Sequence, residues 1–149
     1  RQSDSVVELI TSIDPVLRCF RDSWTIARDE VSVGPDLVAR LVPGFCRSAL
    51  EAACKEAVRR RRYAKGVPHD RVEQAIEDAR NLQNLAALAI FDDDKQGGNV
   101  YSHLNNKLGR WAGDAFRAVK EGAHGNYKGA VDELIRNSEK IAQALRYAS

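Results

Sequence analysis

The sequence has no methionine, few cysteines and no long apolar run, and these absences exclude several classes of protein. Its longest apolar run covers residues 85–91, whereas a transmembrane helix needs about 20 residues, so no membrane span is predicted. Residues 1–5 lack the apolar core of a signal peptide. Because the chain begins with Arg1 and contains no methionine, we expect it to be a domain of a longer protein.

Cysteine and histidine are too few and too scattered to predict a metal site. Cys19, Cys46 and Cys54 are odd in number and form no CxxC motif, and the histidines lie far apart along the chain. Zinc ligands usually occur at short, regular spacings. We therefore expect no metal and no other cofactor. We interpret Cys46 and Cys54 as small buried side chains, and we expect a cytoplasmic protein.

The length and the charge balance indicate one globular domain. The chain has 149 residues, and its 23 basic and 21 acidic side chains leave a formal net charge of +2. A chain of this length buries roughly 68–70% of its unfolded surface, which is enough for a core without disulfides. The near-neutral balance excludes a uniformly basic nucleic-acid coat, so any contact with nucleic acid must come from a local basic patch.

Apolar residues recur at three- and four-residue steps over most of the chain, which predicts an all-α fold. Short connections between the predicted helices, including an exposed loop at residues 92–99, favour an antiparallel bundle that covers residues 43–149. Its four long helices are predicted at residues 43–65, 70–91, 100–121 and 127–147.

The first part of the chain, residues 1–42, is predicted to hold short helices and an irregular linker. Its apolar pattern covers residues 6–17 and is interrupted at Pro15. Glycine–proline pairs at residues 34–35 and 43–44 are expected to break any long helix, because proline lacks the backbone N–H that a helix interior uses. We expect this part and the bundle to form one compact domain.

The third predicted helix carries a row of polar side chains that could act on RNA. Residues seven apart on a helix differ by only about 20° around its axis. Arg110, Arg117 and His124 therefore share one face, together with Asp114 and Glu121. Arginine can hold a phosphate and stabilise charge in a transition state, and histidine can move protons at neutral pH. With the 2′-hydroxyl of RNA as nucleophile, this set could cleave a phosphodiester without a metal.

The stretch from Arg117 to Tyr127 resembles the hallmark of the HEPN superfamily. Arg117 is followed after six residues by His124 and then by Gly125-Asn126-Tyr127, directly before the last predicted helix. HEPN domains are commonly dimeric, metal-independent endoribonucleases of toxin–antitoxin and anti-phage systems, and some are fused to large ATPases. The resemblance implies a HEPN-like bundle, a homodimer, transfer or messenger RNA as substrate, and an antitoxin or ATPase as a possible partner.

The resemblance also implies roles for individual residues. His124 is expected to be the general acid and base, and Arg117 is expected to bind the scissile phosphate and to stabilise the transition state. Five neighbouring residues are expected to support this pair: Asp114, Lys120, Glu121, Asn126 and Tyr127. Basic residues elsewhere are expected to guide the RNA: Arg59, Arg60, Arg61, Arg62 and Arg110.

Other interpretations of the same residues stay open from the sequence. Arg117 could form an ordinary surface ion pair with Asp114 or Glu121. His124 could be a cation that stabilises the end of a helix, and the arginine cluster at residues 59–62 could be a solvated helix end. The whole chain could be a non-catalytic dimerisation or interaction module of a larger ATPase-type defence protein. It could also be a nucleic-acid-binding domain that uses the arginine cluster.

Overall fold

The computed structural model describes residues 14–122 and 127–148, and within these two ranges the chain forms helices and turns but no strand. The prediction of an all-α protein is confirmed. In chain order the helices are α2 (Pro15–Arg28), α3 (Glu30–Val33), α4 (Pro35–Ala64), α5 (His69–Asp78), α6 (Leu82–Phe91), the short 3₁₀ helix η1 (Asp94–Asn99), α7 (Val100–Leu108), α8 (Trp111–Glu121) and α9 (Val131–Arg146).

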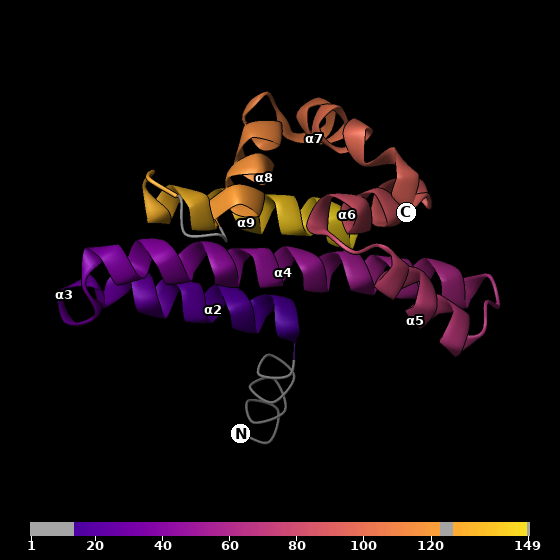
Figure 1. The fold of residues 1–149 in the computed structure, drawn as a ribbon, viewed down its shortest axis with the longest axis horizontal. Helices are drawn as coiled ribbons and strands as arrows, with labels where there is room; N and C mark the ends of the chain where they lie inside the picture. The colour runs from indigo at the N-terminus through magenta and orange to yellow at the C-terminus, as the bar shows by residue number, and fades with distance from the viewer. Residues whose placement is uncertain (1–13, 123–126, 149) are drawn as a thin grey trace, which may run out of the picture.

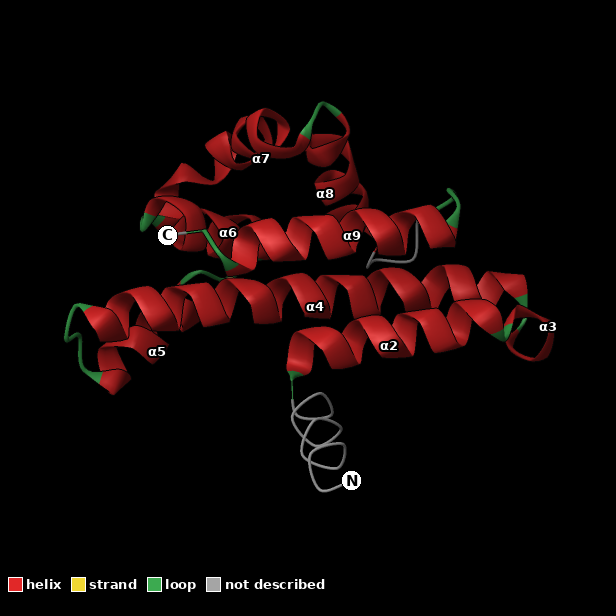
Figure 2. Ribbon diagram, turned by 180° about the vertical axis from the view of Figure 1, so that it is seen from behind, coloured by secondary structure: helices red, strands yellow, loops and turns green. Residues whose placement is uncertain are grey.

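Helix α4 is the central element of the fold. Figures 1 and 2 show α2 along one side of it and α9 and α6 along another, with α7 farthest from it. Most of its buried side chains are alanine, cysteine or valine, and small side chains let neighbouring helices approach closely. The buried residues of α4 are Val38, Val42, Pro43, Cys46, Ala49, Leu50, Ala53, Cys54, Ala57 and Val58. The interpretation of Cys46 and Cys54 as small core residues is therefore confirmed.

Helix α2 begins at Pro15, where the sequence predicted an interruption. Proline suits the first position of a helix because the N–H that it lacks would have no partner there. Asp14 caps this end, and its carboxylate accepts hydrogen bonds from the N–H groups of Val16 at 3.0 Å and Leu17 at 3.3 Å. The helix then continues to Arg28, so the irregular linker expected before residue 43 is wrong for this stretch.

Pro43 lies inside α4 and does not end it, so the expected break at residues 43–44 is wrong. A proline in a helix interior costs about 3 kcal/mol because one backbone hydrogen bond is lost. Here the flanking residues Val38, Val42 and Cys46 are at most 1% exposed, and Pro43 is itself buried. The apolar area that they bury offsets the lost hydrogen bond, and the helix therefore begins eight residues earlier, at Pro35.

A turn at Asn81 divides the helix predicted at residues 70–91 into α5 and α6. The side chain of Asn81 accepts a hydrogen bond from the N–H of Asn84 at 2.8 Å and so caps α6. Asp70, whose spacing to Glu73 resembled an N-cap, lies instead in the first turn of α5. The prediction of one continuous helix is wrong because this cap occurs in the middle of a continuous apolar pattern.

A second turn, at Gly109, divides the helix predicted at residues 100–121 into α7 and α8. Gly109 has a φ of 135° and a ψ of 167°, a backbone conformation that is essentially restricted to glycine. Across this corner the backbone N–H of Gly113 donates to Oδ1 of Asn105 at 2.7 Å, which holds α7 and α8 together. The expected loop at residues 92–99 contains η1, and the last helix begins at Val131 rather than at residue 127.

The N-terminal helices share one hydrophobic core with the rest of the described chain. Val16 and Phe20 of α2 are at most 5% exposed and belong to the same buried cluster as Phe116 of α8 and Ile135 of α9. Helix α2 contacts both α4 and α9.

Arg146 near the end of α9 joins three helices through charge. Its guanidinium pairs with the Asp14 carboxylate at 2.7 Å and also with Glu56 of α4. Burial by itself raises the pKa of the Asp14 carboxyl, but hydrogen bonds from Arg146 and from the N–H groups of Leu17 and Val16 outweigh burial and hold the pKa below its usual value. These ion pairs hold the start of α2 and the end of α9 against α4.

We predict that Gly109→Ala destabilises the fold by about 1–3 kcal/mol, because alanine must adopt a φ that favours glycine. An alanine Cβ at this position would also lie 3.0 Å from two ring atoms of Trp111. Urea denaturation followed by circular dichroism measures the change. Gly98→Ala is the matched control, since no atom lies within 4 Å of its added Cβ. Equal stability of the two variants would contradict the prediction.

We also predict that Asp14→Asn lowers the free energy of unfolding at pH 7 by about 1 kcal/mol, the scale of one charge-assisted contact. Asparagine caps helices as well as aspartate does, so the change isolates the charge. A carboxyl whose pKa is lower in the folded state stabilises the fold above its unfolded pKa of about 3.9, and that contribution is lost as the pH falls through the folded value.

The difference in the free energy of unfolding between Asp14→Asn and the parent chain should therefore become smaller as the pH is lowered from 5 to 2.5. Urea titrations at each pH measure this difference. Asp22→Asn, on the same helix and without a side-chain hydrogen bond or ion pair to a described residue, should match the parent at every pH. A deficit of Asp14→Asn that stays constant down to pH 2.5 would show that the carboxylate charge is not the cause.

Candidate functional site

The polar face predicted for the third helix is present on α8. Asp114, Arg117 and Glu121 are exposed, whereas Phe116 and Val119 on the opposite side of the helix are fully buried. Arg110 is exposed at the residue that precedes α8. Two of the expected site residues, His124 and Asn126, lie outside the described residues.

Arg117 rests on an aromatic ring and not on a carboxylate. Its guanidinium carbon lies 4.7 Å from the centre of the Tyr101 ring, which belongs to α7. Within residues 14–122 and 127–148 no acidic side chain comes within 4.0 Å of this guanidinium, including Asp114 and Glu121 on the same helix. A cation held over an aromatic face keeps its N–H donors available. The surface ion-pair interpretation of Arg117 is therefore not supported.

Lys120, one turn further along α8, is held on the same tyrosine. Its Nζ donates to the hydroxyl of Tyr101 at 2.8 Å and to Oε1 of Gln83 at 2.9 Å, and the Tyr101 hydroxyl donates to the same Gln83 oxygen at 3.2 Å. Gln83, from α6, is anchored in turn because its Nε2 donates to the carbonyl of Gly97 at 2.9 Å. Residues of α6, α7 and α8 thus meet at one tyrosine, which holds two cations in place. We call this group of four residues the Tyr101 platform (Tyr101, Gln83, Arg117 and Lys120).

The tyrosine and the glutamine of this platform are the residues that sequence reasoning missed. Tyr101 lies 16 residues before Arg117, and Gln83 lies 37 residues before Lys120. Neither belongs to a motif, and only the turn at Gly109 brings α7 back alongside α8. The edge of the Tyr101 ring also packs on Phe116, with ring centres 5.7 Å apart. No spacing pattern in the chain indicates this contact.

Tyr127 has a local partner. Its hydroxyl donates to the carbonyl of Ala130 at 2.8 Å, across the turn that leads into α9. Burial raises the pKa of this hydroxyl, and the negative charge of Glu133 raises it further. Tyr127 therefore stays protonated at neutral pH and orders the entry to α9.

The arginine cluster at residues 59–62 does not form one strip. Consecutive residues of a helix point about 100° apart, and each guanidinium here meets a different part of the chain. Arg59 pairs with Glu73 at 2.6 Å, Arg60 donates to the carbonyl of Arg146, Arg61 donates to the carbonyl of Ala148 at 3.0 Å, and Arg62 pairs with Asp92 at 2.9 Å. These contacts hold α5, the end of α6 and the C-terminal residues against α4. The interpretation of the cluster as a solvated helix end is therefore also incomplete.

The described thiols are poorly suited to nucleophilic chemistry. Burial raises the pKa of Cys46 to about 11, although hydrogen bonds with Ser138 and Ser23 oppose the shift. Burial also raises the pKa of Cys54 well above its usual value. Both side chains are thiols at neutral pH, whereas the thiolate is the reactive form.

In the described parts of the chain, no group of three histidine, cysteine, aspartate or glutamate side chains is placed to hold a metal ion. None of the described helices has the length and apolar character needed to cross a membrane. No protein-family model, no curated protein and no solved structure matches this chain.

We predict that Tyr101→Phe lowers the free energy of unfolding by about 1 kcal/mol, because Lys120 and Gln83 lose a hydrogen-bonding partner while the ring stays in place. A double-mutant cycle with Lys120→Met should give a coupling energy of about 0.5–1 kcal/mol in urea denaturation. Lys107→Met, an exposed site on the same helix as Tyr101, is the control and should not couple. Additive effects of Tyr101→Phe and Lys120→Met would contradict the described network.

Proposed function

We propose that this chain is a HEPN-like, metal-independent endoribonuclease domain of a bacterial defence or toxin–antitoxin protein. The observation that supports this proposal best is the exposed guanidinium of Arg117, which rests on the ring of Tyr101 and has no carboxylate partner in the described ranges. A cation that lies over an aromatic ring is held in place while its N–H groups stay available. This one is ordered and its charge is available to an anion.

Lys120 adds a second ordered cation to the same surface. Because its ammonium group is held between Tyr101 and Gln83, little side-chain entropy is lost when a phosphate approaches. Arg117 can hold two oxygens of one phosphate, and Lys120 acts as a point charge for a neighbouring phosphate. Two adjacent phosphates of a single RNA strand are the ligand that suits this arrangement.

The proposed reaction uses the RNA itself as nucleophile. A base removes the proton of the 2′-hydroxyl, the 2′-oxygen attacks the adjacent phosphorus, and the bond from phosphorus to the 5′-oxygen breaks. The leaving 5′-oxygen takes a proton, and the products are a 2′,3′-cyclic phosphate and a 5′-hydroxyl. The motif assigns the proton transfers to His124, and Arg117 stabilises the negative charge on the phosphate oxygens in the transition state.

The family resemblance extends the proposal to the assembly. HEPN-like domains commonly act as dimers, so we propose a homodimer and, in the longer protein, an antitoxin or ATPase that controls cleavage. The HEPN-like bundle would cover residues 43–149, with α7 and α8 as the broken third helix. A dimer that does not bind RNA at low salt would favour the alternative, a non-catalytic interaction module.

The proposal predicts cleavage of end-labelled transfer or messenger RNA in the presence of EDTA, with 2′,3′-cyclic phosphate ends on the products. Arg117→Ala and His124→Ala should each lower the rate by about 10²–10³-fold, the usual cost of losing one transition-state contact or one acid–base group. Lys120→Met should weaken RNA binding and reduce its dependence on salt. Melting curves followed by circular dichroism confirm that each variant is folded.

Arg71→Ala is the matched control, because Arg71 is an exposed arginine on α5, away from the Tyr101 platform. Its cleavage rate should equal that of the parent chain. If the folded Arg117→Ala or His124→Ala variant cleaves as fast as the parent, the assigned site is wrong. If the parent cleaves only when a divalent metal ion is added, the metal-independent mechanism is wrong.

A further inference from the structure

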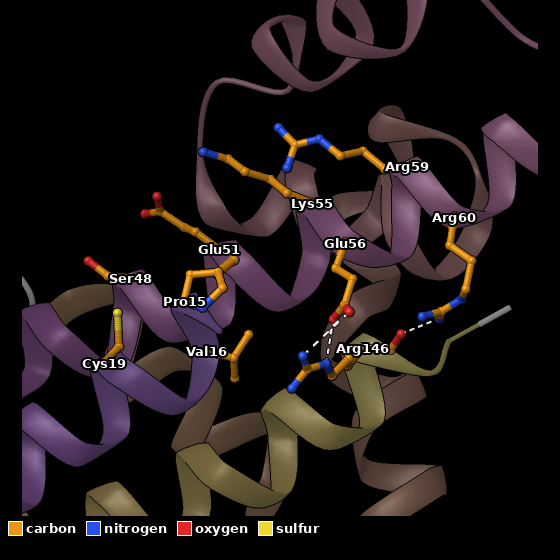
Figure 3. Close-up of a pocket in the computed structure, with 11 residues that line it drawn as sticks. Pro15, Val16, Cys19, Ser48, Glu51, Lys55, Glu56, Arg59, Arg60 and Arg146 are labelled. Atoms are coloured by element: carbon orange, nitrogen blue, oxygen red, sulfur yellow. Dashed lines mark hydrogen bonds and ion pairs between the residues drawn. The ribbon is translucent and has the colours of Figure 1, made fainter. Parts of the chain in front are cut away.

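A cavity of about 720 Å³ opens where α2, α4 and the end of α9 meet, and it contains no residue of the Tyr101 platform. Figure 3 shows it bounded by Pro15 and Val16 of α2, by side chains of α4 and by Arg146 of α9. Small-molecule sites usually have volumes of about 300–1,000 Å³. The volume is therefore that of a binding site for a small molecule, and nothing in the proposed ribonuclease chemistry uses it.

One part of the cavity wall is apolar. Pro15, Val16 and Cys19 come from the first turns of α2, and Ala52 faces them from α4. Burial and the nearby charge of Asp22 raise the pKa of the Cys19 thiol, so it adds no negative charge at neutral pH. An apolar body can bury surface against these four side chains, which is the main favourable term for binding a small ligand.

Further along α4 the wall becomes cationic. Glu56 is neutralised by Arg146, the pair drawn with dashed lines in Figure 3, and Glu51 is neutralised by Arg47 at 2.9 Å. Arg59 is paired with Glu73. Arg146 also pairs with Asp14, so the five cations on and around the wall face four carboxylates and leave a surplus of one positive charge.

Lys55 and Arg60 are the cations on this wall that have no acidic partner. Over residues 14–122 and 127–148, no carboxylate oxygen lies within 4.0 Å of either group. Arg60 donates to a neutral acceptor, the carbonyl of Arg146, and its guanidinium lies 5.6 Å from the centre of the Tyr147 ring. Lys55 is half-buried although it makes no hydrogen bond to a described residue. Figure 3 shows its ammonium on the same side of α4 as the Arg59 guanidinium and pointing away from Arg60. An anion placed there would contact a cation that no described carboxylate reaches within 4.0 Å.

We propose that this cavity binds a small amphiphilic anion, with its apolar body against Pro15, Val16 and Ala52 and its single anionic group at the ammonium of Lys55. The cavity wall follows α4 from Ser48 to Arg60, a length of about 18 Å at 1.5 Å per residue. A medium-chain fatty acid and a two-ring aromatic acid are both short enough to lie along this wall. A divalent cation does not suit the surplus of positive charge, and a nucleotide does not use the apolar end.

The test is a fluorescence titration with 8-anilino-1-naphthalenesulfonate, an aromatic anion, beside N-phenyl-1-naphthylamine, which has the same rings without the sulfonate. The parent chain should bind the sulfonate saturably at one site and bind the neutral amine at least tenfold more weakly. Lys55→Glu should weaken sulfonate binding by roughly tenfold or more, since it removes a charge-assisted contact and adds repulsion. Ala52→Trp should abolish the binding of both probes by filling the cavity.

Lys107→Glu makes the same change of charge on α7, outside the cavity, and should leave both titrations unchanged. Melting curves exclude unfolded variants, and decanoate should displace the sulfonate in competition if the site accepts an aliphatic body. Three results would each overturn the proposal: no saturable sulfonate binding, equal affinity for the neutral amine, or parental affinity in both folded Lys55→Glu and Ala52→Trp. The result is independent of RNA cleavage, because Arg117 and His124 are not involved.

Discussion

The burial of α4 is the constraint on which the rest of the structure depends. A 30-residue helix with one broad apolar face must be covered along its length, and α2, α6 and α9 supply that cover. Its buried positions are mostly small residues such as Ala49, Ala53 and Ala57, which bring the covering helices close to its backbone. The same packing keeps the helix continuous through Pro43, where local preference alone would end it.

Charged side chains then determine where the shorter elements attach to this helix. Arg59 holds α5 through Glu73, Arg62 holds the end of α6 through Asp92, and Arg146 ties Asp14 to Glu56. Exposed ion pairs contribute little to stability on their own. Here each pair joins helices that are distant in sequence. Its main effect is therefore to fix where each of those helices lies on α4. Arg146, which forms the last of these contacts, is also part of the wall of the cavity beside Lys55.

The proposed ribonuclease site and the proposed ligand cavity differ in how their cations are arranged. At the Tyr101 platform, Arg117 and Lys120 are ordered by an aromatic ring and by amide and hydroxyl oxygens, so their charges stay available at the surface. In the cavity, Arg59 and Arg146 are paired with carboxylates, whereas Lys55 and Arg60 are not, and part of the wall is apolar. The first arrangement suits a chain of phosphates, and the second suits one anionic group with an apolar body.

Periodicity along the sequence was enough to predict an all-α protein, the buried cysteines, and the shared exposed face of Asp114, Arg117 and Glu121, because these depend on spacing within one helix. The continuity of α4 through Pro43 and the breaks at Asn81 and Gly109 were not predicted, because local caps and distant packing compete there with the apolar pattern. The placement of Tyr101 under Arg117 depends on how α7 folds back on α8. Only the tertiary structure decides that contact, because it joins residues whose separation follows no helical repeat.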